Sequence, residues 1–459
     1  MNSYRCFDTA SRRRFFARVL FCHSIATALV LPAYAQPVGG QVSAGTGTID
    51  QTVANTTTIN QATQNLAINW QSFDIGRSEA VQFVQPNSSS IALNRVLGQN
   101  PTSILGSLSA NGQVFVLNPN GVLFGSTAQV NVGGLVASTL NLSDTDFMAG
   151  RNSFSNAGAA GTVVNQGTLT AAQGGYIALL APEVRNEGII TATLGTALLG
   201  AGDKVTLNLN NGSLLSYTID QGSLNALAEN RQLVQADGGQ VYMSAKAADA
   251  LSTAVVNNTG IIEARTLQNH NGTISLMGDM QTGQVNVGGT LDASAPNGGD
   301  GGFIETSAAH VKVANDAKVT TSAPNGSSGT WLIDPNDYTI ASSSGDITGA
   351  TLSTNLGLGN VTILSDNGGA GTAGDINVND GVAWTANTTL TLSAFHDVNV
   401  TQLIDANVGA TGAGSVVLRA DNTGTGPGAD ADSLMASSMM RSCAVCRISA
   451  RKFCEPAKM

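Results

Sequence analysis

The chain has 459 residues, of which 11% are charged and 42% apolar, with 53 glycines and a formal net charge of −10. Typical soluble domains have about 25% charged residues, and chains kept disordered by charge are far less apolar than this one. Residues 1–35 and 441–459 each hold five basic residues and one acidic residue, which leaves 11 Lys and Arg against 29 Asp and Glu between them. Phosphate binding needs clustered basic side chains, so this acidic body excludes nucleic acid and anionic lipid as expected partners.

The first 35 residues have the pattern of a signal peptide. Five arginines precede the apolar run 19–31, and Ala33-Tyr34-Ala35 supplies a small-x-small cleavage pattern before Gln36. We therefore predict export and removal of residues 1–35, with Ala33, Ala35 and Gln36 at the cleavage site. The alternative is a membrane anchor, but the apolar run has about 13 residues where a spanning helix needs about 20. No later segment is apolar over such a length, so we expect no transmembrane span in the mature chain.

Residues 37–160 are rich in large aromatic side chains. These side chains suit a cap at the end of a repetitive fold, with hairpins lying on its flank, because an uncovered terminal strand promotes aggregation. The residues in question are Trp70, Phe73, Phe83, Phe115, Phe124, Phe147 and Phe154.

Two β-prone segments, 114–117 and 122–124, meet at Asn118-Pro119-Asn120-Gly121. Pro119 presets φ at the second position of a turn, Asn120 tolerates the third, and Gly121 can adopt the positive φ that closes it. Taken alone, the segment predicts a tight connection between two strands.

Beyond residue 160, short β-prone runs recur between Gly and Asn turns. The frame V-x-N-x-G opens segments 163–171, 184–192 and 256–264, and its first two glycines are 21 residues apart. A second phrase, a glycine pair followed by alternating residues, begins at Gly174, Gly238 and Gly301.

A period near 20 residues, with short strands that bury one face, predicts an all-β fold: a parallel β-helix with an N-terminal cap and flanking hairpins. Asn residues at its corners can adopt the left-handed conformation and hydrogen-bond to their counterparts one coil away. The alternative, an array of β-sandwiches, needs longer alternating strands and regular hairpin signals, which the sequence lacks.

The run from Ile68 to Gly125, followed by "VNVGGLVAST" (130–139), closely resembles the two-partner-secretion (haemagglutination-activity) domain of filamentous-haemagglutinin exoproteins. The resemblance implies a right-handed parallel β-helix that a partner outer-membrane barrel with periplasmic receptor domains recognises in the periplasm and exports. It also implies that the Asn118 turn has a role in this recognition besides its structural one. It places the NPNG secretion motif at Asn118, Pro119, Asn120, Gly121 and Val122. A second motif, NPNL in the family, falls on Gln85, Pro86, Asn87 and Ser88, where Gln85 and Ser88 depart from the pattern.

The resemblance and the repeats divide the chain into four predicted parts. These are a signal peptide (1–35), a two-partner-secretion β-helix domain (36–290), a continuing β-helix shaft (291–432) and an atypical tail (433–459). The tail holds Cys443, Cys446 and Cys454, and its change of composition suggests an unrelated or out-of-frame ending. No cysteine lies between Cys22 and Cys443, which is compatible with crossing a second membrane unfolded.

Residues with catalytic or metal-binding chemistry are few and scattered. His270, His310 and His396 lie far apart in the sequence, so we assign them surface or corner positions. Gly369–Gly374 matches G-x-G-x-x-G, but the residues after it predict a strand in place of a phosphate-binding helix. Asp334 to Asp337 predicts a turn capped by Asp side chains in preference to a metal site. We therefore expect no catalytic residue, no metal and no cofactor.

These observations favour a secreted, non-enzymatic, adhesin-like exoprotein of a Gram-negative bacterium. It would cross the inner membrane by the Sec pathway and the outer membrane through the partner barrel, and a host-cell surface or a carbohydrate is its expected ligand. A truncated member of a longer adhesin fits the same reading. Two alternatives remain: a polysaccharide-active β-helix enzyme, and the stem of a contact-dependent toxin without its toxic C-terminus.

Overall fold

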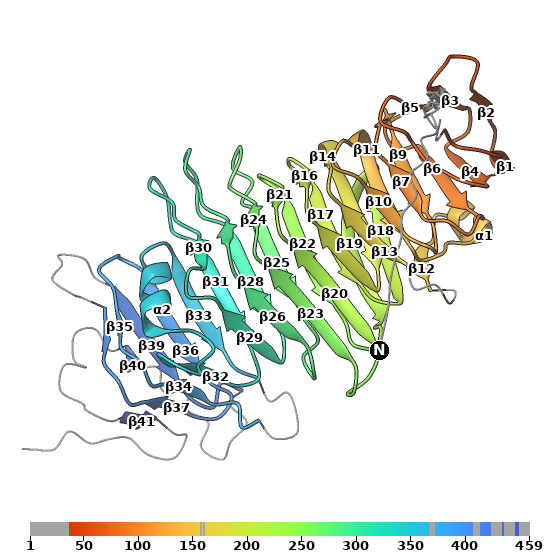
Figure 1. Cartoon of the computed structure of the whole chain (residues 1–459). Coiled ribbons are helices and arrows are strands. Elements are labelled where there is room, and N and C mark those ends of the chain that lie inside the picture. The colour runs from red at the N-terminus through yellow and green to blue at the C-terminus, as the bar shows by residue number, and fades with distance from the viewer. Residues whose placement is uncertain are drawn as a thin grey trace, which may run out of the picture. The chain divides into compact units, whose positions relative to one another are not determined.

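The structure is a computed structural model. It describes residues 36–156, 158, 161–366, 372–406 and 414–423, together with the backbone of strands β40 (Leu434–Met435) and β41 (Cys446–Ile448). Most strands pair in parallel with strands of the neighbouring coils (Figure 1). The predicted parallel β-helix is therefore confirmed. The predicted signal peptide and most of the tail lie outside the described residues.

The first face of the β-helix is a long sheet that starts with one antiparallel pair, β1–β4, and continues in parallel. Its strands are β1 (Gln41–Ala44), β4 (Asn65–Trp70), β6 (Ile91–Val96), β9 (Gln113–Leu117), β11 (Gln129–Ser138), β14 (Thr168–Ala181), β17 (Thr196–Ala201), β22 (Gln240–Ala245), β25 (Thr273–Met277), β28 (Phe303–Ser307), β31 (Thr330–Asp334), β33 (Asn360–Leu364), β36 (Thr389–Ser393) and β39 (Ser415–Arg419).

The second face begins with the antiparallel pair β2–β3 and shares β11 and β14 with the first face, because these two long strands bend from one face into the other. Its own strands are β2 (Gly47–Asp50), β3 (Thr56–Gln61), β5 (Ala80–Val84), β8 (Ser107–Ala110), β16 (Ile189–Thr191), β21 (Leu233–Gln235), β24 (Ile261–Glu263), β27 (Thr290–Asp292) and β30 (Lys318–Thr320).

The third face is an eight-stranded parallel sheet. It consists of β7 (Thr102–Ile104), β10 (Val122–Phe124), β13 (Thr162–Asn165), β15 (Glu183–Asn186), β20 (Asn225–Asn230), β23 (Thr253–Asn258), β26 (Gln284–Val287) and β29 (His310–Val313). Shorter strands follow in later coils: β32 (Tyr338–Ile340), β34 (Ile376–Val378) and β37 (Val398–Val400), with β35 (Val382–Ala383) paired to β38 (Ile404–Asp405).

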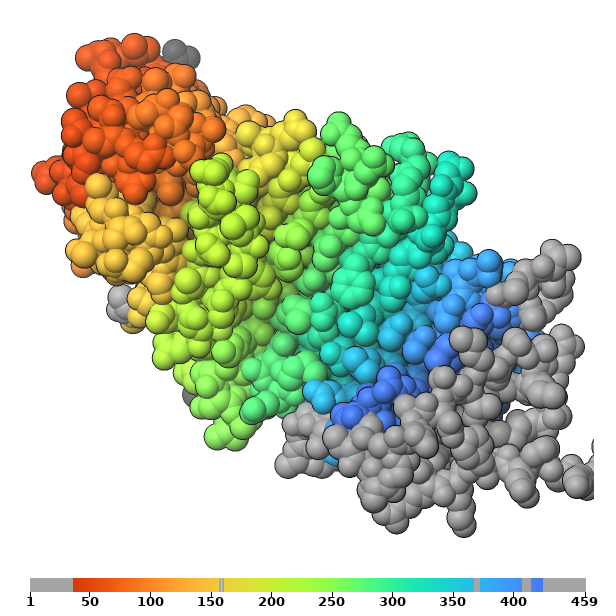
Figure 2. All heavy atoms as spheres, turned by 180° about the vertical axis from the view of Figure 1, so that it is seen from behind, coloured from red at the N-terminus to blue at the C-terminus, as the bar shows by residue number. Residues whose placement is uncertain are grey.

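Alternating side chains explain why these short segments stack. In β13, β15 and β26 every second residue is buried, and the apolar ones point into one continuous core: Val163, Val184, Val285 and Val287. A single coil cannot cover its own apolar face, so each coil is stabilised by its neighbours. Figure 2 shows the consequence at the surface, where segments adjacent in sequence lie side by side in chain order from the orange to the blue residues.

A column of buried asparagines runs along the third face. The Nδ2 atom of Asn165 donates to Oδ1 of Asn186, Asn186 donates in the same way to Asn230, and Asn230 to Asn258, each at 2.8 Å. All four side chains are fully buried. The predicted hydrogen bonding between coils is confirmed, but the predicted left-handed backbone is wrong for these residues, since positive φ occurs at other asparagines such as Asn55 and Asn211.

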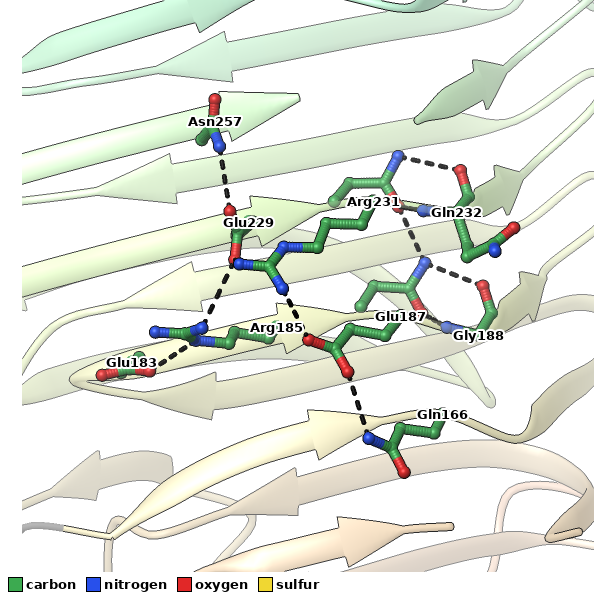
Figure 3. Close-up of polar contacts among 11 residues, drawn as sticks. Gln166, Glu183, Arg185, Glu187, Gly188, Glu229, Arg231, Gln232 and Asn257 are labelled. Carbon is green, nitrogen blue, oxygen red and sulfur yellow. Dashed lines mark hydrogen bonds and ion pairs between the residues drawn. The ribbon is translucent and has the colours of Figure 1, made fainter. Parts of the chain in front are cut away.

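Charged side chains form a network beside this column, on the solvent side of β15 and β20 (Figure 3). Arg231 contacts Glu187 at 3.0 Å and Glu229 at 2.9 Å, and Arg185 contacts Glu183 at 2.6 Å. Glu229 is the most buried of these groups, with 8% of its side chain exposed. The network joins two coils that are separated by an inserted hairpin.

A column of glycines lies where successive coils turn into the first face. A Cβ on Gly175 would meet the carbonyl oxygen of Gly133, one on Gly195 that of Gly175, and one on Gly239 that of Gly195. The glycine pairs seen in the sequence therefore mark the points where two backbones approach too closely for any side chain.

The flank of the first face carries an antiparallel hairpin and a second core. Strand β12 (Asn152–Ser155) pairs with β18 (Lys204–Asn210), which pairs with β19 (Ser213–Gln221). Phe115, Phe147, Phe154 and Tyr176 are buried beneath these strands. The predicted flanking hairpin thus exists, but most of it lies at 204–221, outside the segment 37–160 to which the sequence assigned it.

Two short helices were not predicted: α1 (Asp144–Met148) and α2 (Gly349–Leu356). Each begins at a hydroxyl cap, since Ser143 accepts from the main-chain N–H of Asp146 and Thr348 from that of Thr351. Neither helix, nor any other helical part of the chain that the structure describes, is long and apolar enough to cross a membrane.

Candidate functional site

The Asn118–Gly121 segment forms the predicted turn between β9 and β10. The main-chain N–H of Gly121 donates to the carbonyl of Asn118 at 3.0 Å, and Gly121 has a φ of +126°. The strands on either side match the two β-prone segments of the sequence. Pro119 is half-buried and Asn120 is exposed, whereas Asn118 and Gly121 are buried.

Asn118 anchors the turn to the coil before it and the coil after it. Its Nδ2 atom donates to the carbonyl of Asn100 at 2.9 Å and to Oγ1 of Thr102 at 3.0 Å. Its Oδ1 atom accepts from the main-chain N–H of Asn120 at 3.0 Å, and its own N–H donates to the carbonyl of Ser138 at 2.9 Å. Asn118 is fully buried, so these bonds hold the backbone and its side chain is not available to a partner.

Asn120 presents the same functional group at the surface. Its Nδ2 atom donates to the carbonyl of Gly98 at 3.0 Å and contacts Oδ1 of Asn118 at 3.2 Å. Leu97, next to Gly98, is 62% exposed. On the other side, a Cβ at Gly161 would lie 2.6 Å from the carbonyl oxygen of Pro119, so the next coil packs directly on the turn.

The second motif forms a loop between β5 and β6. Gln85 is buried, and its Nε2 atom donates to Oε1 of Gln61 at 3.0 Å and to the carbonyl of Gln113 at 3.2 Å. Its Oε1 atom accepts from the N–H of Gly112 at 2.9 Å. Pro86, Asn87 and Ser88 are exposed. Thus Gln85, which departs from the family pattern, holds three coils together.

The two motifs do not form one site. The 85–88 loop precedes β6, the Asn118 turn follows β9, and these strands pair in parallel from Ile91↔Gln113 to Arg95↔Leu117. The motifs therefore lie at opposite ends of five strand residues, roughly 16 Å apart at about 3.3 Å per residue. Neither contains a titratable side chain, so both offer hydrogen-bonding groups for recognition and no acid or base for catalysis.

The remaining sequence candidates lie elsewhere. His270, His310 and His396 are all exposed. Within 334–337, Asp337 accepts main-chain N–H bonds from Gly374 at 2.7 Å and Asp375 at 2.9 Å, so it caps the turn of the next coil. Residues 376–378 form strand β34, as predicted after the glycine-rich segment, whose residues 369–371 lie outside the described residues.

Several other predicted positions also lie outside the described residues. These are Ala33 and Ala35 at the predicted cleavage site, the Cys443 and Cys454 positions, and the side chain of Cys446. Gln36 is the first described residue.

Comparison with known proteins decides the family. A family model described as the TPS secretion domain matches residues 33–293. The chain belongs to this family. It is a two-partner-secretion exoprotein of the filamentous haemagglutinin type, as the resemblance implied. The match contains both motifs and the strands that hold them.

Two curated relatives, both named heme/hemopexin-binding protein and both from Haemophilus influenzae, are 34% and 32% identical over 250 and 256 residues. These alignments cover 53% and 51% of this chain but only 27% of each relative. A crystal structure of the HMW1 secretion domain from Haemophilus influenzae superposes with a TM-score of 0.58 at 26% identity, covering 78% of this chain and 90% of that one. None of these names describes an enzyme.

Proposed function

We propose that this TPS-domain protein is the exported partner of an outer-membrane transporter, and that the turn Asn118, Pro119, Asn120, Gly121 and Val122 takes part in its recognition. The observation that carries the proposal is the different exposure of the two asparagines in the turn. Asn118 is buried and fixes the backbone, whereas Asn120 is exposed and sits beside exposed Leu97. The Nδ2 atom of Asn120 donates to Gly98 and Asn118, but its amide lies at the surface, where a partner protein can reach it.

The loop of Gln85, Pro86, Asn87 and Ser88 is a second candidate contact for the transporter, through its exposed residues 86–88. We assign Gln85 itself to folding, because its side chain bridges Gln61, Gly112 and Gln113. The strands beside the two loops, β5, β6, β9 and β10, are each paired on both sides in the folded protein. These segments can therefore add to a sheet edge of a periplasmic receptor domain only before the chain folds, and the folded loops offer side-chain contacts instead.

After export, the protein acts at the cell surface or in the medium of a Gram-negative bacterium as a non-enzymatic, adhesin-like binding protein. Support comes from its family, and from relatives whose names describe heme and hemopexin binding or secretion. Residues 1–35 serve as a Sec signal peptide, cleaved before Gln36. The coils beyond 293 continue the β-helix and provide a shaft with exposed loops for a host-surface or carbohydrate ligand.

The test is secretion of three single variants by cells with and without a cognate outer-membrane transporter. Asn120→Ala removes the exposed amide and Asn118→Ala removes the buried one. Asn208→Ala is a matched control at an exposed position of the flanking hairpin. We expect wild type and Asn208→Ala in the medium only when the transporter is present. Asn120→Ala should lose only a little thermal stability, because its bond to Gly98 is solvent-exposed, yet its secretion should fall at least tenfold.

Asn118→Ala should lose both secretion and stability, since it leaves Asn100 and Thr102 without their partner. If Asn120→Ala is secreted as well as Asn208→Ala, the turn has only a structural role. If the wild type reaches the medium equally without the transporter, the export proposal itself fails.

A further inference from the structure

Three metal-binding groups converge in the later coils, outside the matched family region. The Nδ1 atom of His396 lies 2.8 Å from Oδ1 of Asp375 and 3.8 Å from Oδ2 of Asp397. One ligand atom from each residue lies within 4.8 Å of the other two. The proposed export function does not use these residues, since they follow residue 293, where the family match ends.

Backbone bonds between two coils fix this arrangement. The N–H of His396 donates to the carbonyl of Gly374 at 3.0 Å, and the N–H of Ile376 donates to the carbonyl of Asp397 at 2.9 Å. The N–H of Asp397 donates to Oδ1 of Asp375 at 3.0 Å. Asp375 and Asp397 each stand directly before a strand, β34 and β37, and these strands pair in register from Ile376↔Val398 onward. The stacked sheet therefore sets the separation of the ligands before any ion binds.

Exposure differs across the group in a way that suits a metal centre. The side chain of Asp397 is 2% exposed, that of Asp375 25% and that of His396 57%. The exposed histidine leaves one side of the group open to solvent, where a water molecule can complete the coordination.

The set of donors points to a transition metal. Carboxylates alone suit calcium and magnesium, whereas one imidazole with two carboxylates suits zinc and its neighbours in the first transition series. In a tetrahedral zinc site the ligand atoms lie about 2.0–2.1 Å from the metal, and hence roughly 3.3 Å from one another. The His396 Nδ1 atom lies 2.8 and 3.8 Å from the two carboxylates, which brackets that value, and all the ligand atoms lie within 4.8 Å of one another. Movements of at most about 1.5 Å therefore assemble the site.

We propose that Asp375, His396 and Asp397 form a binding site for a divalent transition-metal ion, zinc in the first instance, which joins two consecutive coils of the shaft. The ion binds Nδ1 of His396 and one oxygen from each carboxylate, and water fills the open position. His396 and Asp397 follow Asp375 by 21 and 22 residues and lie on the next coil. The bound ion therefore joins the two coils and stabilises the stacking of β37 on β34.

Zinc binding to the full chain tests the proposal, by competition with a chromophoric chelator. All five cysteines are replaced by serine in every sample, because thiolates in the tail would bind zinc independently. We expect one zinc equivalent per chain. His396→Gln and Asp375→Asn should each weaken binding at least tenfold, while His270→Gln, a change at another exposed histidine, should leave it unchanged.

Two further readouts separate ligand loss from misfolding. Zinc should raise the thermal unfolding midpoint of the parent protein but not that of His396→Gln, whose metal-free midpoint should match the parent because its ring is exposed. Cobalt added to the parent should give the visible absorption of a nitrogen- and oxygen-coordinated ion, which depends on no variant. Absence of zinc binding in the parent, or equal binding in His396→Gln, would overturn the proposal and leave an ion pair between His396 and Asp375. The secretion assay does not respond to either result, so this proposal and the export function can fail separately.

Discussion

Removing one asparagine from the middle of the buried column should cost more stability than its single side chain suggests. Asn186 accepts from Asn165 and donates to Asn230, in both cases at 2.8 Å, and none of the three has any solvent exposure. In Asn186→Ala the Nδ2 atom of Asn165 and the Oδ1 atom of Asn230 each lose their shortest partner. Water cannot reach them without opening the coil.

Two buried polar groups left unsatisfied cost about 1–3 kcal/mol each, or roughly 2–6 kcal/mol together. The lower half of that range applies, since longer contacts remain: Asn165 to the carbonyl of Ile189, and Asn230 from the N–H of Gln232, both at 3.4 Å. We therefore expect Asn186→Ala to lower the free energy of unfolding by about 3 kcal/mol.

Asn257→Ala is the matched control. Asn257 neighbours the column but is half-buried, and its side chain donates to Glu229 alone, at 2.9 Å. Its loss should cost less than about 1 kcal/mol. Urea unfolding followed by circular dichroism measures both variants, with equal m-values as the check that the same surface unfolds in each. A difference between the two variants below about 0.5 kcal/mol would refute the view that the column acts as a connected network.

Two further perturbations test burial and backbone approach. The pKa of Asp334 is raised to about 6 by burial and by the nearby carboxylates of Asp366 and Glu305. The folded state therefore binds this proton more tightly than the unfolded state, and the resulting stabilisation is complete below about pH 4 and lost as the pH rises through 6. Because Asp334 is partly solvated, we expect Asp334→Asn to raise the free energy of unfolding by only about 1 kcal/mol over the wild type at pH 8, and to leave it unchanged at pH 4. Equal urea midpoints for the two proteins at pH 8 would contradict this. Gly239→Ala should lower the free energy of unfolding by about 2 kcal/mol or more, because its Cβ would meet the carbonyl of Gly195. In the control Gly200→Ala the Cβ meets only the movable Cδ2 of Leu180, at 3.1 Å, so the loss should be below about 1 kcal/mol. Equal losses in urea unfolding would show that the backbone at Gly239 moves to make room for the Cβ.

The repeat phrases predicted the fold because their fixed residues meet physical constraints that recur in each coil. Asn165, Asn186 and Asn258 all stand in the V-x-N-x-G frame and all join the column. Asn230 was missed, since Gln232 stands where the frame has glycine and the step from Asn186 is 44 residues. The period near 20 was also too short for this part of the chain, because the next step, to Asn258, is 28 residues.

The sequence located the Asn118 turn but could not assign different roles to its two asparagines. Which one is buried depends on Asn100 and Thr102, which belong to a different coil and have no fixed spacing from the turn. The sequence also could not predict that His396 lies beside Asp375, because the two residues come together only when the length of the coil between them is known. The short helices escaped because five and eight residues give too little periodicity, although Ser143 and Thr348 offered cap signals.

The asparagine column continues without a break across coils of very different length. Its steps are 21, 44 and 28 residues, and the longest contains the whole β18–β19 hairpin. The hydrogen bonds depend only on which residues occupy the stacked positions and are indifferent to how much chain leaves and returns between them. The corners of the coils are therefore positions where evolution or protein engineering can insert a binding loop or an entire domain without changing the register of the stacked strands.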